Sequence, residues 1–571
     1  MRIAYLALKV FALKAKAFEK STKNPITVQE KLLLGYLHKN RSTEYGRKYH
    51  FSEVRSIPDY QKLVPMSDSE SIFPYVESIS SGARNVLTKD KVVFFGLTSG
   101  TTGKPKLIPV TNFSRAKKAE MLGLWTYYIM RDHPDILDGK ILAIINPEEE
   151  AFTKTGIPCG AESGHAYKNM PAIVRNFYAI PYDVFHIPDY ESRYYCILRI
   201  AMGQNITTIA TLNPSTIALL CQKIEKYKDI LIDDIKRGAL YKNLDIPLEI
   251  RKSIERGLRA NPGRAGELES ILQGKKTLLP KDFWPNLKLI ECWKGGTVKI
   301  YLKELPQYFG DIPVRDFGCF STEARASIPM SEDGAGGVLA VGANFYEFIP
   351  KEDMVKRQKR FLLCNELEKD REYFIIVTTP GGLYRYNIDD IVKVTGFFNN
   401  TPVIEFVQKG LNAVSIMGEK LYESQLNEAV NRAVDKNKLL LEFFSAFAQH
   451  THAGSACARH SDGCALPACA QGPRYVFLVE FDGPVSSQCR KDLLRSIEEE
   501  LGRENAEYKY ARDAQLLKPP ILKVIKKGEF ERYRARRVME GANDSQLKVP
   551  ELTSDENFQK NFIIEEEIGL D

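Results

Sequence analysis

Short runs rich in apolar and β-branched residues alternate with stretches of helical periodicity over the first 400 residues of the chain. Runs that predict buried strands lie at residues 92–95, 141–145, 206–210, 287–290 and 373–377. Helical patterns lie between many of them: one covers residues 26–40, and another begins at Asn213, a good N-cap residue, with Pro214 in its first turn. This alternation predicts an α/β domain with a largely parallel or mixed sheet that ends near Val407.

The pattern changes beyond that point. Residues 408–412, Gln-Lys-Gly-Leu-Asn, predict a hinge. They are followed by a helical pattern at 424–436, a strand pattern at 475–481 and a helical pattern at 488–501. We therefore predict a large domain at 1–407, a hinge at 408–415 and a small, mobile α+β cap domain at 416–571.

An insert at residues 450–472 is rich in Ala, His and Cys. Its side chains that could ligate zinc are His450, His452, Cys457, His460, Cys464 and Cys469. The insert has no Cys-x-x-Cys pair and no regular ligand spacing, and its composition cannot build a core. We predict a disordered surface loop, with a metal site as the alternative.

Composition and charge exclude several classes of protein. The 571 residues are 44% hydrophobic and 27% charged, which is typical of a soluble globular protein. A net charge of +7 from 80 basic and 73 acidic residues does not predict a nucleic-acid-binding face. No run of about 18 apolar residues predicts a membrane span, and residues 1–18 are expected to form an amphipathic helix packed on its own domain, with a helix on a membrane surface as the alternative. Ten scattered cysteines are typical of reduced thiols, so we expect a cytoplasmic protein.

The segment 98–106, Thr-Ser-Gly-Thr-Thr-Gly-Lys-Pro-Lys, follows the apolar run at 92–95 and has the chemistry of a polyphosphate-binding loop. Glycines let backbone N–H groups approach phosphate oxygens, hydroxyl groups add donors and lysines supply positive charge. The pattern differs from the P-loop of kinases, because Gly103-Lys104 is followed by Pro105 and not by Ser or Thr. A plain flexible turn is the alternative.

Three later segments extend this pattern. They are residues 316–323 (DFGCFSTE), 382–392 (GLYRYNIDDIV) and 409–423, which contains KGLN and GEKLYE. Together with the phosphate loop they resemble, in the same order, the motifs of adenylate-forming enzymes, which activate a carboxylic acid by joining it to AMP. Residues 345–350 (FYEFIP), 392–402 and 546–550 (QLKVP) resemble one branch in particular, the auxin-responsive family of acyl-acid amido synthetases.

The resemblance spans residues 87–550 and implies both a fold and a reaction. The implied fold is a large multi-layer adenylating domain with mixed sheets and a small cap that rotates. The implied substrates are ATP with Mg²⁺, a small carboxylic acid and an amino acid, which the enzyme would join as an amide.

The resemblance also assigns roles to particular residues. Implied catalytic residues are Lys106, Glu323, which would also hold Mg²⁺, and Lys548. Implied nucleotide-binding residues are Thr98, Ser99, Gly100, Thr101, Thr102, Gly103, Phe320, Thr322, Tyr346, Asp390, as the ribose ligand, and Lys409. The segment 160–165 is expected to border the nucleotide or acyl pocket, with a plain loop as the alternative.

Two positions depart from the family pattern. Cys319 stands where an aromatic residue is usual, so stacking on adenine would fall to Phe320 or Tyr346. Asp389 stands where glycine is common, which leaves open whether it or Asp390 binds the ribose.

Each assignment has an alternative. Glu323 could be a carboxylate at a helix N-terminus, Asp389 and Asp390 could be turn formers with Arg385 as their surface partner, and Lys548 could be a surface lysine. The basic residues between 523 and 537 are expected to form a solvated face, because glutamates interleave with them. For the whole protein, the alternatives are an acyl-CoA ligase with the same first step and a catalytically silent nucleotide-binding or scaffold protein.

Overall fold

The computed structural model describes residues 2–98, 106–296, 299–354, 356, 359–410, 413–414, 416, 419, 421–449, 473–540, 547 and 549–570. The chain divides into two compact units, and it passes from the first to the second between Val407 and Gln408. The second unit comprises residues 408–540 and 547–571.

The first unit contains three sheets. One has the strand order β2-β1-β5-β4, and its strands are Lys106–Thr111, Val92–Thr98, Pro158–Gly160 and Ala151–Phe152. The second is β3-β6-β7-β8, with all strands parallel, formed by Lys140–Ala143, Ile206–Ala210, Leu289–Glu291 and Val314–Arg315. The third is β11-β12-β13-β14-β10-β9, formed by Phe345–Pro350, Glu372–Thr378, Tyr386–Phe398, Thr401–Lys409, Gly337–Leu339 and Ser327–Ile328.

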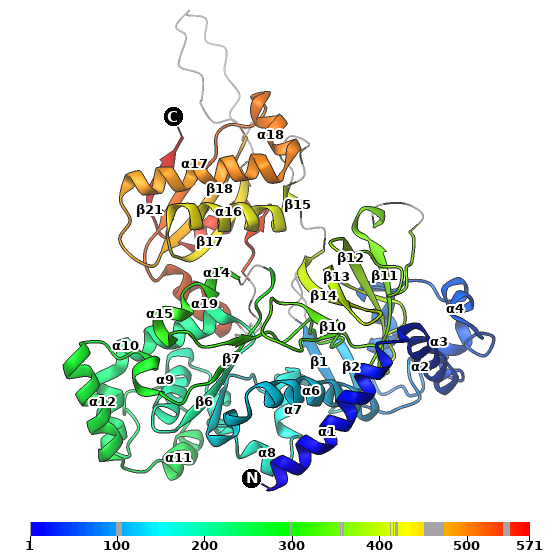
Figure 1. Cartoon of the computed structure of the whole chain (residues 1–571), viewed down its shortest axis with the longest axis horizontal. Coiled ribbons are helices and arrows are strands. Elements are labelled where there is room, and N and C mark those ends of the chain that lie inside the picture. The colour runs from blue at the N-terminus through cyan, green and yellow to red at the C-terminus, as the bar shows by residue number, and fades with distance from the viewer. Residues whose placement is uncertain are drawn as a thin grey trace, which may run out of the picture. The chain divides into compact units, whose positions relative to one another are not determined.

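Helices cover these sheets (Figure 1). Those before the parallel sheet are α1 (Arg2–Ser21), α2 (Pro25–Asn40), α3 (Glu44–Lys48), α4 (Ile57–Leu63), α5 (Ser69–Ser80) and α6 (Asn112–Asp132). Those within it are α7 (Glu162–Lys168), α8 (Ala172–Arg175), α9 (Tyr190–Ala201), α10 (Pro214–Arg237), α11 (Leu248–Gly257), α12 (Pro262–Lys275), α13 (Pro280–Phe283), α14 (Lys299–Leu302) and α15 (Leu305–Phe309). The first helix, α1, packs on α6 and buries Ala15 and Phe18 in the core, as expected for a helix covered by its own domain.

Helix α6 begins directly after β2, and a capping box fixes that junction. The Thr111 hydroxyl accepts a hydrogen bond from the backbone N–H of Ser114 at 3.1 Å, and the Ser114 hydroxyl accepts one from the N–H of Thr111 at 2.9 Å. Such a cap stabilises a helix by about 1 kcal/mol. It therefore sets the direction in which α6 leaves the strand that follows the phosphate loop.

The second unit has a five-stranded sheet in the order β20-β17-β18-β19-β21. Its strands are Leu552–Thr553, Leu441–Gln449, Arg474–Phe481, Ile521–Ile525 and Ile564–Gly569. The unit also contains the short pair β15 (Ala413–Val414) and β16 (Leu421–Tyr422), and the helices α16 (Glu423–Asn437), α17 (Ser487–Glu504), α18 (Ala506–Asp513) and α19 (Glu529–Met539). The basic residues of α19 pair with acidic neighbours, as in the contact of Arg537 with Glu540 at 2.8 Å.

The predicted elements agree with these bounds. The predicted strands correspond to β1, β3, β6, β7, β12 and β18, and the predicted helices to α2, α16 and α17. Asn213 caps α10, since its side chain accepts a hydrogen bond from the Ser215 N–H at 3.0 Å. The mixed α/β fold class is confirmed, the insert at 450–472 lies outside the described residues, and none of the described helices is both apolar and long enough to cross a membrane.

Candidate functional site

The two ends of the predicted phosphate loop are paired strand residues. Thr98 closes β1 and Lys106 opens β2, and the two are opposite each other in the antiparallel ladder. Lys106 is half-buried. The predicted phosphate ligands Ser99, Gly100, Thr101, Thr102 and Gly103 lie outside the described residues, so their roles stay predictions.

A close contact joins β1 to the segment that carries Glu323. A Cβ atom placed on Gly96, two residues before Thr98, would lie 2.4 Å from Cγ2 of Thr322 and 3.4 Å from Cγ of Glu162. Real Cβ atoms do not approach carbon atoms as closely as 2.4 Å, so only glycine allows this approach. Strand β1, which leads into the phosphate loop, is therefore in direct contact with Thr322, the residue before the predicted magnesium ligand Glu323.

Lys118 of α6 also contacts the segment that carries Glu323. Its Nζ donates to Oε1 of Glu162 at 2.5 Å and to the backbone carbonyl of Thr322 at 2.6 Å. Burial raises the pKa of Glu162, the nearby Lys118 ammonium lowers it, and the charge of Glu323 raises it further. Two carboxylates and one lysine thus share a small, poorly hydrated volume.

The sequence did not point to Lys118. It lies in an ordinary helical pattern, with none of the turn or glycine signals that mark the phosphate loop. One signal could have found it: Ser114, Lys118 and Met121 recur at the spacing that places residues on one face of a helix.

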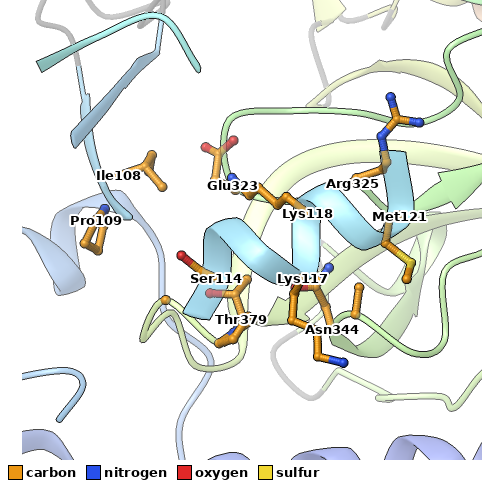
Figure 2. A pocket seen from close by; sticks show the side chains of 13 residues that line it. Ile108, Pro109, Ser114, Lys117, Lys118, Met121, Glu323, Arg325, Asn344 and Thr379 are labelled. Atoms are coloured by element: carbon orange, nitrogen blue, oxygen red, sulfur yellow. The ribbon is translucent and has the colours of Figure 1, made fainter. Parts of the chain in front are cut away.

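That face of α6 lines a narrow pocket (Figure 2). The volume open to the centre of a water molecule is about 10 Å³, enough for a single water molecule. The lining residues are Ile108, Pro109, Ser114, Lys117, Lys118, Met121, Glu323, Arg325, Ala343, Asn344, Thr379, Pro380 and Gly381.

Glu323 projects its carboxylate beside Lys118 at this pocket (Figure 2). It is 9% exposed, and no residue that the structure describes donates a hydrogen bond to it. No helix begins in residues 316–326, so the alternative role of a helix N-terminal carboxylate is wrong. A largely buried carboxylate without protein donors is suited to bind a cation or a ligand.

No described cluster of three or more His, Cys, Asp or Glu side chains is arranged to hold a metal ion. This is compatible with magnesium, which takes one or two carboxylates and completes its shell with water and substrate phosphate oxygens. The chemistry of the Glu323 oxygens suits such an ion.

The Asp389–Asp390 pair lies on a bulge in β13. Between the pairs Phe374–Ile391 and Ile376–Asn387, β12 advances by two residues and β13 by four. Asp389 has φ +62°, in the region that favours glycine, and its side chain is exposed, whereas Asp390 is half-buried. The backbone therefore explains why glycine suits position 389.

Electrostatics connects this bulge with the Glu323 segment. Burial raises the pKa of Cys319, and the charges of Asp316, Asp390 and Glu405 raise it further. Burial also raises the pKa of Tyr386, and among the charges that raise it further Glu323 has the largest effect. The second and third motifs therefore face a common region of the first unit.

Arg385 is not a surface partner of the aspartates. It is 3% exposed, and its Nε donates to Glu347 at 2.9 Å. Its Nη2 also donates to Glu347, at 3.0 Å, and its Nη1 donates to the backbone carbonyls of Gln61 and Val64, at 2.9 and 2.7 Å. Arg385 is a structural residue that anchors the start of β13.

The two candidates for adenine stacking differ in exposure. Tyr346 is 1% exposed and its hydroxyl donates to the backbone carbonyl of Arg325 at 3.2 Å, so its ring belongs to the core. Phe320 is half-buried. This difference favours Phe320.

The remaining predicted residues belong to the second unit or lie outside the described chain. Lys409 ends β14, is half-buried and falls in the second unit. Lys548 lies outside the described residues, as does most of the predicted hinge beyond residue 410. Their roles stay predictions.

Comparisons with known proteins agree over nearly the whole chain. Family profiles match residues 14–314 as the GH3 family N-terminal domain, 337–409 as its central domain and 424–557 as its C-terminal domain. An Arabidopsis thaliana protein named indole-3-acetic acid-amido synthetase GH3.10 is 27% identical over 94% of each chain. A rice (Oryza sativa subsp. japonica) protein named jasmonoyl-L-amino acid synthetase GH3.5 is 25% identical over 95% of this chain and 94% of its own length.

Solved structures share the fold. The GH3.15 acyl acid amido synthetase superposes with a TM-score of 0.83 at 23% identity, covering 97% of each chain. A 2-hydroxyisobutyryl-CoA ligase in the postadenylation state superposes with a TM-score of 0.51 at 10% identity, covering 95% of this chain and 92% of its own.

Proposed function

The chain belongs to the GH3 family, whose profiles match it from residue 14 to residue 557 with two gaps, and we propose that it is an ATP-dependent acyl-acid amido synthetase. The proposed reaction joins a small carboxylic acid to the amine of an amino acid and releases AMP and pyrophosphate. The observation that carries the proposal is the contact of Gly96 with Thr322, because it joins the phosphate-loop strand to the Glu323 segment within one unit.

In the first proposed step, a carboxylate oxygen of the acid attacks the α-phosphorus of ATP. A new P–O bond forms, the bond to pyrophosphate breaks, and an acyl-AMP remains. The loop at 98–106 and Lys106 would hold the phosphates, and Glu323 would hold Mg²⁺. When bound, Mg²⁺ would neutralise the charge on the phosphate oxygens, so that one anion can approach another.

The nucleoside would lie beside the bulge in β13. We assign the ribose hydroxyls to Asp390, since a carboxylate can accept two hydrogen bonds from a diol. Adenine would stack on Phe320, and Thr322 would contact the AMP phosphate.

In the second proposed step, the amino acid's nitrogen attacks the carbonyl carbon of the acyl-AMP. The C–N bond forms, the C–O bond to AMP breaks, and a proton leaves the nitrogen. We propose that residues 416–571 act as a mobile cap that turns about 408–415. Lys548 would be the contribution of the cap to the site, and Lys409 that of the hinge. The cytoplasm is the proposed compartment.

Exchange of labelled pyrophosphate into ATP tests the first step, because it requires the acid. We expect exchange that depends on both an acid and Mg²⁺ and is lost in Glu323→Ala and Lys106→Ala. Separate addition of an amino acid or coenzyme A then distinguishes the amide ligase from a thioester-forming ligase. Normal cellular function of both variants, with no exchange in the wild type, would instead support a catalytically silent protein.

A further inference from the structure

Arg325 is a buried cation in the wall of the pocket that Glu323 and Lys118 line. It is 3% exposed. Its guanidinium lies over two aromatic rings, with the carbon atom 5.4 Å from the Trp125 ring centroid and 5.0 Å from that of Phe320. Two such cation–π contacts hold a guanidinium in place without using its N–H donors.

Most of the Arg325 donors have no partner among the described residues. One N–H donates to the backbone carbonyl of Phe317 at 3.2 Å. No carboxylate of the described chain lies within ion-pair distance of the guanidinium, although Asp316 and Glu291 act on it from farther away.

Neither of these two acids forms a direct ion pair with Arg325. The carboxylate of Asp316 already accepts hydrogen bonds from the backbone N–H groups of Lys294, at 2.6 Å, and Gly318, at 2.5 Å. Burial raises the pKa of Glu291 to about 8, so that side chain is mostly protonated at pH 7. The Arg325 guanidinium stays protonated, as arginine does in proteins. An uncompensated buried cation is costly unless a ligand pairs with it.

The position of Arg325 determines how long such a ligand must be. Figure 2 shows its guanidinium turned away from the Ser114 end of α6. Trp125, on which it stacks, follows Lys118 by seven residues, or about 10 Å along the helix at 1.5 Å per residue. A molecule whose reacting carboxylate lies near Lys118 and Glu323 would need an extended chain of several atoms to reach Arg325, and the pocket, which has room for one water molecule in this structure, would have to widen to admit it.

We propose that the acyl substrate is a dicarboxylic acid, whose second carboxylate binds the Arg325 guanidinium. This inference rests on the proposed function. A carboxylate matches the planar fork of a guanidinium and can accept two hydrogen bonds from it. A purely aromatic or aliphatic acid would leave the cation buried and unpaired.

Pyrophosphate exchange with matched acids tests the proposal. The pairs glutarate and pentanoate, adipate and hexanoate, and suberate and octanoate have equal chain lengths and differ only in the second carboxylate. We expect the wild type to use the better dicarboxylate with a kcat/KM at least tenfold above that of its partner. Arg325→Met, which keeps an unbranched side chain beside the rings, should raise KM for the dicarboxylate at least tenfold and increase kcat/KM for the monocarboxylate. Arg325→Lys should restore part of the preference.

Arg131→Met is the matched control, because Arg131 also lies over an aromatic ring of α6, that of Tyr128 at 5.0 Å, but does not line the pocket. It should leave the preference as in the wild type. If the wild type prefers the monocarboxylates, this inference is overturned while the proposed function stands, whether or not Arg325→Met folds. The same holds if Arg325→Met and the wild type show an equal preference. If no acid of any kind supports pyrophosphate exchange, both the proposed function and this inference are overturned.

Discussion

Gly96→Ala is the substitution that most directly tests how the site is assembled. The new methyl group would lie 2.4 Å from Cγ2 of Thr322, whereas carbon atoms in contact lie about 3.5–4.0 Å apart. Either β1 or the Thr322–Glu323 segment must therefore move by about 1 Å. Overpacking of this kind costs about 1–3 kcal/mol of stability, and a displacement of about 1 Å in a reacting site costs about 100-fold in rate.

The assay compares pyrophosphate exchange by Gly96→Ala, the wild type and Gly396→Ala. Gly396 also lies in a strand, β13, but a Cβ atom there meets nothing within 4 Å. We expect Gly96→Ala to exchange about 100-fold more slowly at a temperature where circular dichroism shows it to be folded, and Gly396→Ala to match the wild type. A folded Gly96→Ala protein with exchange within twofold of the wild type would refute the proposed link between β1 and the Glu323 segment.

Three further predictions concern stability and the nucleoside site. Glu347→Ala leaves the buried Arg385 unpaired and should lower the free energy of unfolding by about 3–5 kcal/mol. At the unfolding entropy expected for a unit of about 400 residues, this lowers the first thermal transition by about 4–6 °C. The control Glu368→Ala, at an exposed ion pair, should change that transition temperature by less than 1 °C. The pKa of Glu291 rises from 4.5 to about 8 on folding. Above pH 4.5 the unfolded chain therefore binds fewer protons than the folded one, and the free energy of unfolding falls until about pH 8. Urea unfolding should show a larger gain in stability for Glu291→Gln at pH 8 than at pH 5, and an equal gain at both would contradict this. Asp390→Asn should raise the KM for ATP at least tenfold and Asp389→Asn less than threefold, and the reverse order would assign the ribose to Asp389.

Local patterns predicted the individual elements because each depends on neighbouring residues. The runs at 92–95 and 206–210 are buried strands, and Asn213 caps α10, since apolar content and capping act over a few positions. The left-handed backbone at Asp389 agrees with the glycine expected there.

Contacts between distant segments could not be predicted in this way. Lys118 reaches Glu162 and Thr322, which are 44 and 204 residues away in the sequence. The alternative that made Arg385 a surface partner of the aspartates is wrong for the same reason, because its partner Glu347 lies 38 residues earlier on another strand. Only tertiary packing brings these groups together, and no local pattern encodes that packing.

The fate of the acid's oxygen atoms tests the central claim most directly. The wild type is incubated with ATP, Mg²⁺, an amino acid and an acid whose carboxylate carries two ¹⁸O atoms, and the products are weighed by mass spectrometry. An acyl-AMP intermediate predicts an amide with one ¹⁸O atom and AMP with the other. Formation of ADP, or of AMP without the label, would contradict the proposed adenylation.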